Sequence, residues 1–363
     1  TGNLVVSAGA LTITNPSALG SSSGSTTINS GALLNINITD GLYWGSNIDE
    51  PLSISGTGSG NGVLVNQGNQ YVTYRGLVTL QANSTVRQDG SYFIFNPTSG
   101  NAFNGSFDLT FDTNTSYIQV YDPIATGNGS LTKTGSNALY LFGDNTFTGS
   151  VTVSAGTLYA GNNNALGTTA GGVTVASGAA LYLYGGVTVG AEAISVVGTF
   201  GSAYGNNIYQ GVVTLTDNAT IANTDGDTLF VINSSGSISG ANKNLTFSGA
   251  GVIVVDDPIS LGSGSLTLSG NPIVYLQQAN TFTGNIFLSG GVLAPYANDA
   301  LGDSGSTNKI TFQGGAVRHY STNTSELYAR FNTPTSGNAW GIDPGNFSIN
   351  YNEGLGETFT GTN

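Results

Sequence analysis

The chain has 363 residues, of which 39% are hydrophobic and only 7% charged, and its net charge is −13. Seven lysines and arginines in total are too few for nucleic-acid binding, which rests on many basic contacts with phosphates, and the same deficit argues against docking on an anionic lipid surface. The absence of cysteine excludes a disulfide framework and thiolate metal sites, and no apolar run is long enough for a membrane-spanning helix.

In chain order, the sequence predicts short strands separated by turns of Gly, Asn and Ser. Residues 1–38 contain an alternating pair, 26–28 and 33–38, joined by a turn at 29–31. Residues 40–120 are less regular. Their strand candidates are 62–65, 71–74, 77–80, 92–95, 110–112 and 117–120. No window of about a dozen residues shows a helical period, so the pattern indicates an all-β chain of many short strands.

A string in the middle of the chain is repeated. NTFTGSVTVSAGTLYAGNNNALG at 145–167 returns at 280–302 as NTFTGNIFLSGGVLAPYANDALG, and its second part opens the chain at 1–20. All three copies run from Thr-Gly to Ala-Leu-Gly with the same spacing. A repeat held in register over this length predicts a repeat architecture. The sub-repeats are approximately 1–121, 122–256 and 257–363.

The stretch 129–167 resembles the autotransporter-associated β-strand repeat, also called the passenger-associated transport repeat. The resemblance rests on Gly-Ser-Leu-Thr-Lys-Thr-Gly at 129–135, Ala-Leu-Tyr-Leu at 138–141, Asn-Thr-Phe-Thr-Gly at 145–149 and Val-Ser-Ala-Gly-Thr-Leu at 153–158. Phe147 stands where the family commonly has Tyr, and in the second copy Leu268 replaces the family's Lys. The resemblance implies a right-handed parallel β-helix, secretion, a place in large bacterial surface proteins and no catalytic residues. We therefore expect one continuous all-β solenoid over 1–363, with irregular loop insertions.

In such a solenoid the motif residues are expected to build coils. Strands of successive coils stack about 4.8 Å apart, and a coil of roughly 20 to 25 residues gives about 15 coils. Asn145 is expected to bond its own turn or the coil above, and Gly149 and Gly156 to mark sharp turns or positive φ. Leu131, Leu139, Leu141, Val151, Val153 and Leu158 are predicted to point inward. The motif residues are Asn145, Thr146, Phe147, Thr148, Gly149, Gly156, Ala165, Leu166, Gly167, Asn280, Thr281, Phe282, Thr283, Gly284 and Gly302.

Few residues offer catalytic or metal-binding chemistry. His319 is the single histidine and has no acidic or nucleophilic partner nearby in sequence, which favours a surface strand residue over a general base. Acidic pairs occur at Asp225 with Asp227 and at Asp256 with Asp257. They lack the calcium-loop spacing, so turn acids are favoured over a loose Ca²⁺ site, and no cofactor is predicted. Glu192 and Glu326 are isolated, so a paired-carboxylate glycosidase is not supported.

Aromatic residues leave two alternatives open. Tyr140, Tyr159, Tyr182 and Tyr184 could form a face that stacks sugars, but internal ladders or edge-of-sheet packing are favoured. Within 40–120, Tyr43, Trp44, Tyr71 and Tyr74 are the candidates for glycan contact.

These observations favour a non-enzymatic, extracellular structural protein: a segment of a bacterial cell-surface fibre, stalk or filament. The expected partners are further copies end to end, or the continuation of a longer chain, because Thr358-Phe-Thr-Gly361 resembles the start of another motif copy. The alternative is an adhesin, an autotransporter passenger that binds glycans or a host surface through loops in 40–120. A β-helical polysaccharide lyase or hydrolase is disfavoured by the scarcity of basic residues.

Overall fold

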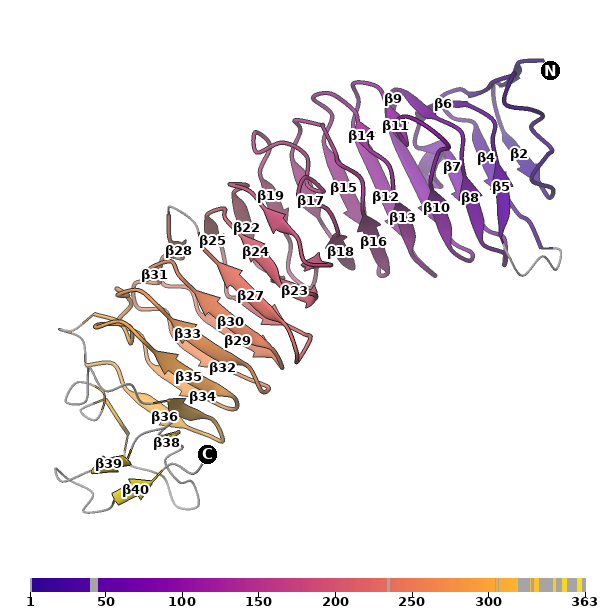
Figure 1. Ribbon diagram of the computed structural model, residues 1–363. Coiled ribbons are helices and arrows are strands. Elements are labelled where there is room, and N and C mark those ends of the chain that lie inside the picture. Colours follow the sequence, from indigo (N-terminus) through magenta and orange to yellow (C-terminus); the bar gives the residue numbers. More distant parts are fainter. Residues whose placement is uncertain are drawn as a thin grey trace. The chain divides into compact units, whose positions relative to one another are not determined.

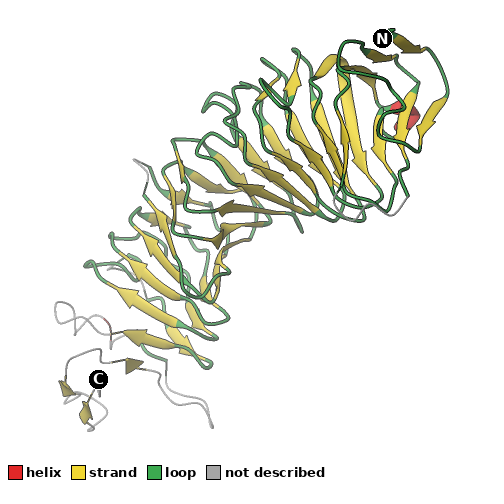
Figure 2. Ribbon diagram, turned by 45° about the vertical axis from the view of Figure 1, so that its right-hand side comes forward, coloured by secondary structure: helices red, strands yellow, loops and turns green. Residues whose placement is uncertain are grey.

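A computed structural model describes residues 2–39, 45–233, 236–303, 305, 307–318, 327 and 330–332, together with the backbone of 342–343, 348–350 and 358–360. The chain divides into two compact units, Thr1–Ile194 and Ser195–Asn363. Each unit is a parallel β-solenoid whose strands are joined by short turns (Figures 1 and 2). The described residues form about 14 coils, close to the expected 15. The predicted all-β solenoid is thus confirmed.

In unit 1 each coil has three faces, and each strand pairs in parallel with its counterparts in neighbouring coils. The first face holds β1 (Leu4–Val6), β3 (Thr26–Ile28), β6 (Leu52–Gly56), the start of β9 (Val78–Gln88), β11 (Phe103–Asn104) and β14 (Ile124–Ala125). The second face holds β2 (Ala10–Ile13), β4 (Leu33–Ile36), β7 (Leu64–Asn66), the end of β9, β12 (Leu109–Thr113), β15 (Leu131–Thr134), β17 (Val151–Val153) and β19 (Val173–Val175).

The third face of unit 1 carries most of the surface aromatic residues. Its strands are β5 (Ser46–Ile48), β8 (Val72–Tyr74), β10 (Phe93–Phe95), β13 (Ile118–Val120), β16 (Ala138–Leu141), β18 (Thr157–Ala160) and β20 (Ala180–Tyr184). The short strands β21 (Thr188–Val189) and β22 (Ile194–Val196) follow, and a 3-10 turn lies at Gly58–Gly60.

Unit 2 repeats the three-faced plan. Its first face holds β25 (Val213–Leu215), β28 (Ile238–Ser239) and β31 (Ile259–Ser260). The second holds β23 (Thr199–Tyr204), β26 (Ala219–Asn223), β29 (Leu245–Gly249), β32 (Leu266–Leu268), β34 (Ile286–Leu288) and β36 (Ile310–Phe312). The third holds β24 (Asn207–Tyr209), β27 (Leu229–Ile232), β30 (Val252–Val255), β33 (Ile273–Leu276), β35 (Val292–Pro295), β37 (Ala316–Arg318) and β38 (Ile342–Asp343).

One pair departs from the parallel pattern. β39 (Ser348–Asn350) and β40 (Thr358–Thr360) are antiparallel. The Thr-Phe-Thr string in β40, which the sequence likens to the start of a motif copy, is therefore not in a parallel ladder here. None of the described residues forms a helix long and apolar enough to cross a membrane.

The core is a set of aliphatic and aromatic columns running from coil to coil. Leu139, Leu158 and Leu181 pair in register on the third face and are fully buried. All six residues predicted to point inward are buried, which confirms the alternation inferred from the sequence. Burying a side chain of this size contributes about 1.5–3 kcal/mol, so the columns supply the main stabilisation.

A polar column lines the buried corner between the second and third faces of unit 1. Asn66, Gln88 and Thr113 pair in register and are fully buried. The Asn66 side chain donates to the Ser91 carbonyl (3.0 Å), and the Gln88 side chain accepts from the Gly90 amide (2.8 Å). These amides satisfy backbone groups that the corner removes from the ladders.

Candidate functional site: the repeat motif and a tyrosine stripe

Asn145 joins the coils on both sides of it. Its Oδ1 accepts from the Ile124 amide of one neighbouring coil (2.8 Å), and its Nδ2 donates to the Ala165 carbonyl of the other (2.6 Å). The side chain is buried, where a satisfied amide is stabilising and an unsatisfied one is costly. The sequence predicted a bond to its own turn or to the coil above, and the bond to the coil below was missed.

Asn280 repeats this geometry in unit 2. It accepts from the Ile259 amide (2.7 Å), donates to the Ala300 carbonyl (2.5 Å) and is equally buried. Because both copies make the same bonds, the motif asparagine is a residue that links adjacent coils through hydrogen bonds.

The residues after each asparagine continue this packing. Phe147 and Phe282 are fully buried core rings. The backbone amides of Thr146 and Thr281 donate to Ile124 and Ile259 in the coil below. The amides of Thr148 and Thr283 donate to the carbonyls of Gly127 and Gly262, each at 2.7 Å.

The motif glycines are required for two different reasons. Gly156 has φ of +65°, as predicted, a conformation that disfavours a side chain. Gly149 does not have positive φ, but a Cβ there would overlap the Gly129 carbonyl oxygen of the adjacent coil, and Gly284 meets Gly264 in the same way. Gly149 is therefore explained by close approach.

The Ala-Leu-Gly ends form the same turn. Ala165 donates to the Asn162 carbonyl and Gly167 to the Asn164 carbonyl, both through backbone amides. Gly167 and Gly302 have positive φ, and a Cβ on either would overlap the carbonyl of Phe147 or Phe282. Leu166 is buried at this corner.

Lys133, the lysine of the motif, is fully buried. Its Nζ donates to the carbonyls of Thr134 (2.5 Å), Gly135 (2.9 Å) and Ala155 (3.1 Å). Burial lowers its pKa to about 8, while the charge of Asp112 opposes the shift. It remains charged near neutral pH and caps three carbonyls at the corner.

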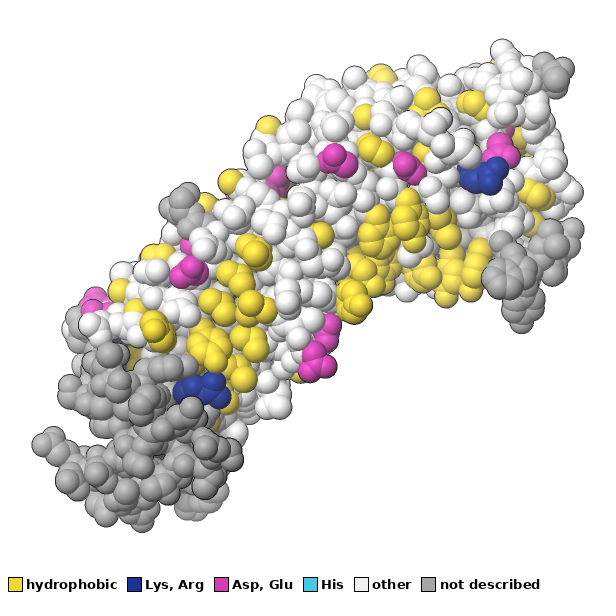
Figure 3. Space-filling view, in the orientation of Figure 1, with side chains coloured by type: hydrophobic (Ala, Val, Ile, Leu, Met, Phe, Trp, Pro, Cys, Tyr) yellow, Lys and Arg dark blue, Asp and Glu magenta, His cyan; other side chains and the backbone are white. Residues whose placement is uncertain are grey.

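The third face of unit 1 carries a continuous tyrosine stripe, defined as Tyr71, Tyr92, Tyr117, Tyr140, Tyr159 and Tyr182. Consecutive ring centroids are 4.0 to 5.8 Å apart. The rings lie outside the core, because they alternate with buried residues along their strands. Of the two favoured arrangements, internal ladders or edge-of-sheet packing, the internal ladder is wrong for Tyr140, Tyr159 and Tyr182, because these partly exposed rings stack on the surface. Figure 3 shows hydrophobic side chains gathered over this face.

The stripe changes column once. Tyr71, Tyr92 and Tyr117 each precede their strand, whereas Tyr140 lies two positions further along, opposite Gln119. The rings of Tyr117 and Tyr140 therefore meet edge to face, at 74°, whereas Tyr140 and Tyr159 are stacked at 9°. Stacking covers ring faces with other rings, which contributes about 0.5–1.5 kcal/mol per pair.

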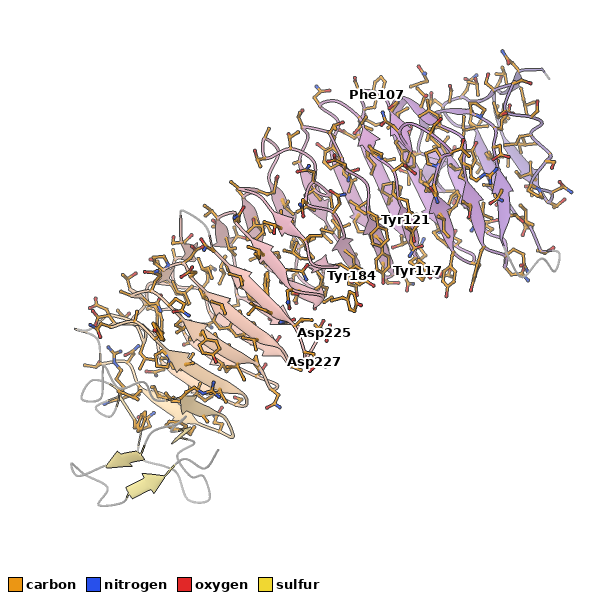
Figure 4. All side chains as sticks on the ribbon, viewed as in Figure 1. Phe107, Tyr117, Tyr121, Tyr184, Asp225 and Asp227 are labelled. Atoms are coloured by element: carbon orange, nitrogen blue, oxygen red, sulfur yellow. The ribbon has the colours of Figure 1, made fainter. Side chains whose placement is uncertain are left out.

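A second group of rings borders the stripe. Tyr121 stacks on Phe142 at 4.9 Å, and Tyr184 meets Tyr140, Phe142 and Tyr159 edge to face. Tyr117, Tyr121 and Tyr184 project from this part of unit 1 in Figure 4. Burial raises the pKa of Tyr140 to about 12, with Tyr159 and Tyr184 adding to the shift.

The predicted glycan contacts do not form one surface. Tyr71 is 44% exposed at one end of the stripe, but Tyr74 is fully buried and its hydroxyl donates to the Glu50 carbonyl at 2.7 Å. The prediction is therefore wrong for Tyr74, because Tyr71 and Tyr74 lie on opposite sides of the strand. Tyr43 and Trp44 lie outside the described residues, as does His319.

The two acidic pairs lie in different surroundings. Asp225 and Asp227 lie in the turn between β26 and β27, with Asp227 exposed (Figure 4). Asp257 is buried, while Asp256 is partly exposed and accepts from the Asn233 side chain at 3.0 Å. Among the described residues, no three His, Cys, Asp or Glu side chains converge as metal ligands.

The fold and these contacts define a parallel β-solenoid whose repeated motif holds coils together. A family model described as the passenger-associated transport repeat matches residues 131–160 and 261–294. The chain thus contains two copies of this repeat, as its sequence indicated, and resembles the secreted or surface passengers in which the repeat occurs. No curated protein and no solved structure is significantly similar to the chain.

Proposed function

We propose that this chain is a non-enzymatic, extracellular structural segment, part of a bacterial cell-surface fibre, stalk or filament. The observation that carries the proposal is the use of the motif residues. Both polar side-chain atoms of Asn145, and both of Asn280, are hydrogen-bonded to neighbouring coils. A motif whose polar groups bond one coil to the next supports a long, rigid structure rather than catalysis.

The surface supports the same role. Only 7% of the residues are charged, and the described part of the chain has four ion pairs, none of them fully buried. Side-chain oxygens bridge successive coils instead: Asn83 Oδ1 accepts from the backbone amide of Asp108, and the Asp108 carboxylate accepts from the backbone amide of Ser130. Such ladders stiffen a rod without creating a binding pocket.

End-to-end association is part of the proposal. The terminal strands of any solenoid present unpaired backbone groups that a further coil can pair with. Negative-stain electron microscopy of the purified chain over a concentration series tests this. We expect rods that lengthen with concentration. Uniform short rods, with a constant monomer mass in light scattering at the highest concentration, would count against it.

The tyrosine stripe favours a second candidate function, adhesion to glycans or to a host surface. Tyrosine is enriched at interfaces because it combines an apolar ring with a hydroxyl. Because the stripe's ring faces are covered by one another, a ligand would use bordering rings such as Tyr121, which is 44% exposed. A glycan array compares the parent chain with Tyr121→Ala and, for the predicted loop surface, Trp44→Ala. Binding that neither substitution weakens would exclude both surfaces.

A further inference from the structure

Glu50 is a buried acid that the repeat motif does not explain. It lies at the corner between β5 and β6 and is 1% exposed. Within the described part of the chain, neither of its carboxylate oxygens has a hydrogen-bond partner, and the hydroxyl of Thr26 is also buried and unpaired. An ionised carboxylate buried in this way is strongly destabilising. A proton or a cation must therefore neutralise it.

Oxygen atoms from two coils converge beside Gly24, next to this carboxylate. Register places Glu50 between Gly24 of one coil and Gly76 of the next. A Cβ on Gly24 would lie 2.8 Å from the Gly2 carbonyl oxygen, 3.1 Å from Glu50 Oε1 and 3.6 Å from Oε2. Three oxygens from two residues that are far apart in sequence thus converge on the side of Gly24 where any other residue would carry its Cβ.

The Thr26 hydroxyl belongs to the same cluster. Burial raises the pKa of Glu50, whereas the adjacent Thr26 hydroxyl and the positive charge of the N-terminus partly lower it. The nearby Arg75 is engaged elsewhere, bonded to Asp49 at 2.7 Å. No described basic side chain forms an ion pair with Glu50.

Two other acids occupy the same kind of corner and show what is particular to Glu50. Asp122 and Asp257 also precede a proline and an aliphatic residue that begins a first-face strand. The residue below Asp122 in register is Asn101 rather than a glycine. Asp257 has Gly236 below it in register, but its side chain is one methylene shorter, so of the three corners only that of Glu50 combines a glycine below with the longer side chain.

We propose that Glu50, Thr26 and the Gly2 carbonyl form a site for a hard divalent cation, of which Ca²⁺ fits best. Calcium takes six to eight oxygen ligands in flexible geometry, including carboxylates, carbonyls and water, whereas magnesium requires a stricter octahedron. The absence of nitrogen and sulfur among these atoms excludes a zinc-type site. The bound ion would tie residue 2 and the 24–26 segment to the next coil. With so few protein ligands, affinity falls in the range of extracellular modules, about 10⁻⁴ to 10⁻³ M.

Terbium luminescence tests the site directly, since Tyr74 can sensitise the ion. Its hydroxyl bonds the Glu50 carbonyl at 2.7 Å. We expect a saturable Tb³⁺ signal that Ca²⁺ displaces, and a thermal transition that rises with Ca²⁺ and returns with EDTA. Glu50→Gln, which preserves shape but removes the charge, abolishes both. Asp225→Asn combined with Asp227→Asn leaves both unchanged.

Gly24→Ala provides an independent variant, because its methyl would lie 2.8 Å from the Gly2 carbonyl oxygen and 3.1 Å from Glu50 Oε1 and would crowd an ion bound to them, while the carboxylate itself is retained. We expect at least a tenfold loss of Ca²⁺ affinity with circular dichroism unchanged. A Tb³⁺ signal that survives in Glu50→Gln overturns the site. So does a parent chain that ignores Ca²⁺ while Glu50→Gln is more stable at pH 7, since a proton alone would then neutralise Glu50. The site does not depend on the proposed structural role, whose failure appears separately as rods that do not lengthen.

Discussion

In the two full copies of the motif, the asparagine bonds to the neighbouring coils in the same way, but the residue at the corner of the coil differs. Asn145 in unit 1 and Asn280 in unit 2 make the same pair of bonds to neighbouring coils. In the first copy Lys133 caps the carbonyls of Gly135 and Ala155. In the second, Leu268 is fully buried in place of that lysine. The asparagine bonds are thus the same in both copies, whereas the corner holds a lysine in one copy and a leucine in the other.

Replacing the lysine is linked to a second change. Gly290 stands in the second copy where Ala155 stands in the first. A Cβ on Gly290 would overlap the Gly270 carbonyl oxygen, which corresponds to the carbonyl that Lys133 holds in unit 1. Only glycine therefore fits at position 290, whereas the first copy, with its lysine, accommodates Ala155. We expect the lysine and the alanine to be coupled.

The outward side of the third face also differs between the units. Unit 1 presents the tyrosine stripe, whereas the partly exposed residues of β27 and β30 in unit 2 are Leu229, Val231, Val252 and Val254. In the motif, Tyr159 of unit 1 corresponds to Ala294 of unit 2. The inward positions stay apolar in both units, whether aliphatic or aromatic, whereas the outward positions change in chemical type.

The largest expected effect is loss of the asparagine. Asn145→Ala leaves the Ile124 amide and the Ala165 carbonyl buried and unpaired, which should lower the free energy of unfolding by about 3 kcal/mol. Asn280→Ala should cost unit 2 a similar amount. Urea unfolding combined with hydrogen exchange measures each unit separately. Asn164→Ala, at an exposed bond to Asp144, should change stability little; equal losses in all three would refute the fastening role.

Close approach of glycines comes next. Gly149→Ala forces a methyl onto the Gly129 carbonyl and should cost about 1–3 kcal/mol by overpacking. Gly190→Ala is the control, since nothing lies within 4 Å of the added Cβ. Chemical denaturation of both variants provides the measurement. If the two lose the same stability, glycine is needed for flexibility rather than for space.

The coupling of Lys133 and Ala155 predicts a rescue. Lys133→Leu strands its three carbonyls and should cost about 2 kcal/mol. Adding Ala155→Gly, which reproduces the second copy, should recover part of that loss, whereas Ala155→Gly alone should be mildly destabilising. A double-mutant cycle in urea gives the interaction energy. Strict additivity would mean that the two positions are independent.

Lys133 also predicts a pH dependence. Its pKa of about 8 lies below the usual 10.5, so the unfolded chain binds more protons between these values and stability rises with pH through that window. Below pH 8 both states are charged and this contribution is constant. The difference between the parent chain and Lys133→Leu, followed from pH 7 to 9.5, should grow above pH 8. A flat difference would mean that the carbonyls hold the pKa at its ordinary value.

The smallest effect is expected on the surface. Tyr159→Ala removes one stacked ring, between Tyr140 and Tyr182, and should cost about 1 kcal/mol. Thr152→Ala, on a partly exposed position of the second face, should cost less. Thermal unfolding of the two variants measures the difference. If Tyr159→Ala leaves the unfolding temperature unchanged, the stripe has no structural role, which would favour adhesion.

Much of the fold could be predicted from the sequence, because strand alternation and a repeat in register constrain it strongly. Leu139 and Leu141 alternate with polar or aromatic neighbours, and this alone placed them inside. Positive φ at Gly156 followed from turn chemistry. Side-chain alternation along the strand could not show whether Tyr71 or Tyr74 points inward, because both positions hold a tyrosine.

The sequence by itself determined that this protein is a stack of β coils and which motif builds them, since both are local patterns repeated along the chain. Only the tertiary structure decided what each coil residue touches. It showed that Asn145 reaches both neighbours, that Gly149 faces a carbonyl, that the tyrosines meet on the surface and that Glu50 lies beside Gly24. These contacts join residues about one coil apart. The asparagine bonds recur at spacings of 20 and 21 residues in both copies, but the sequence does not show which atoms meet across a coil.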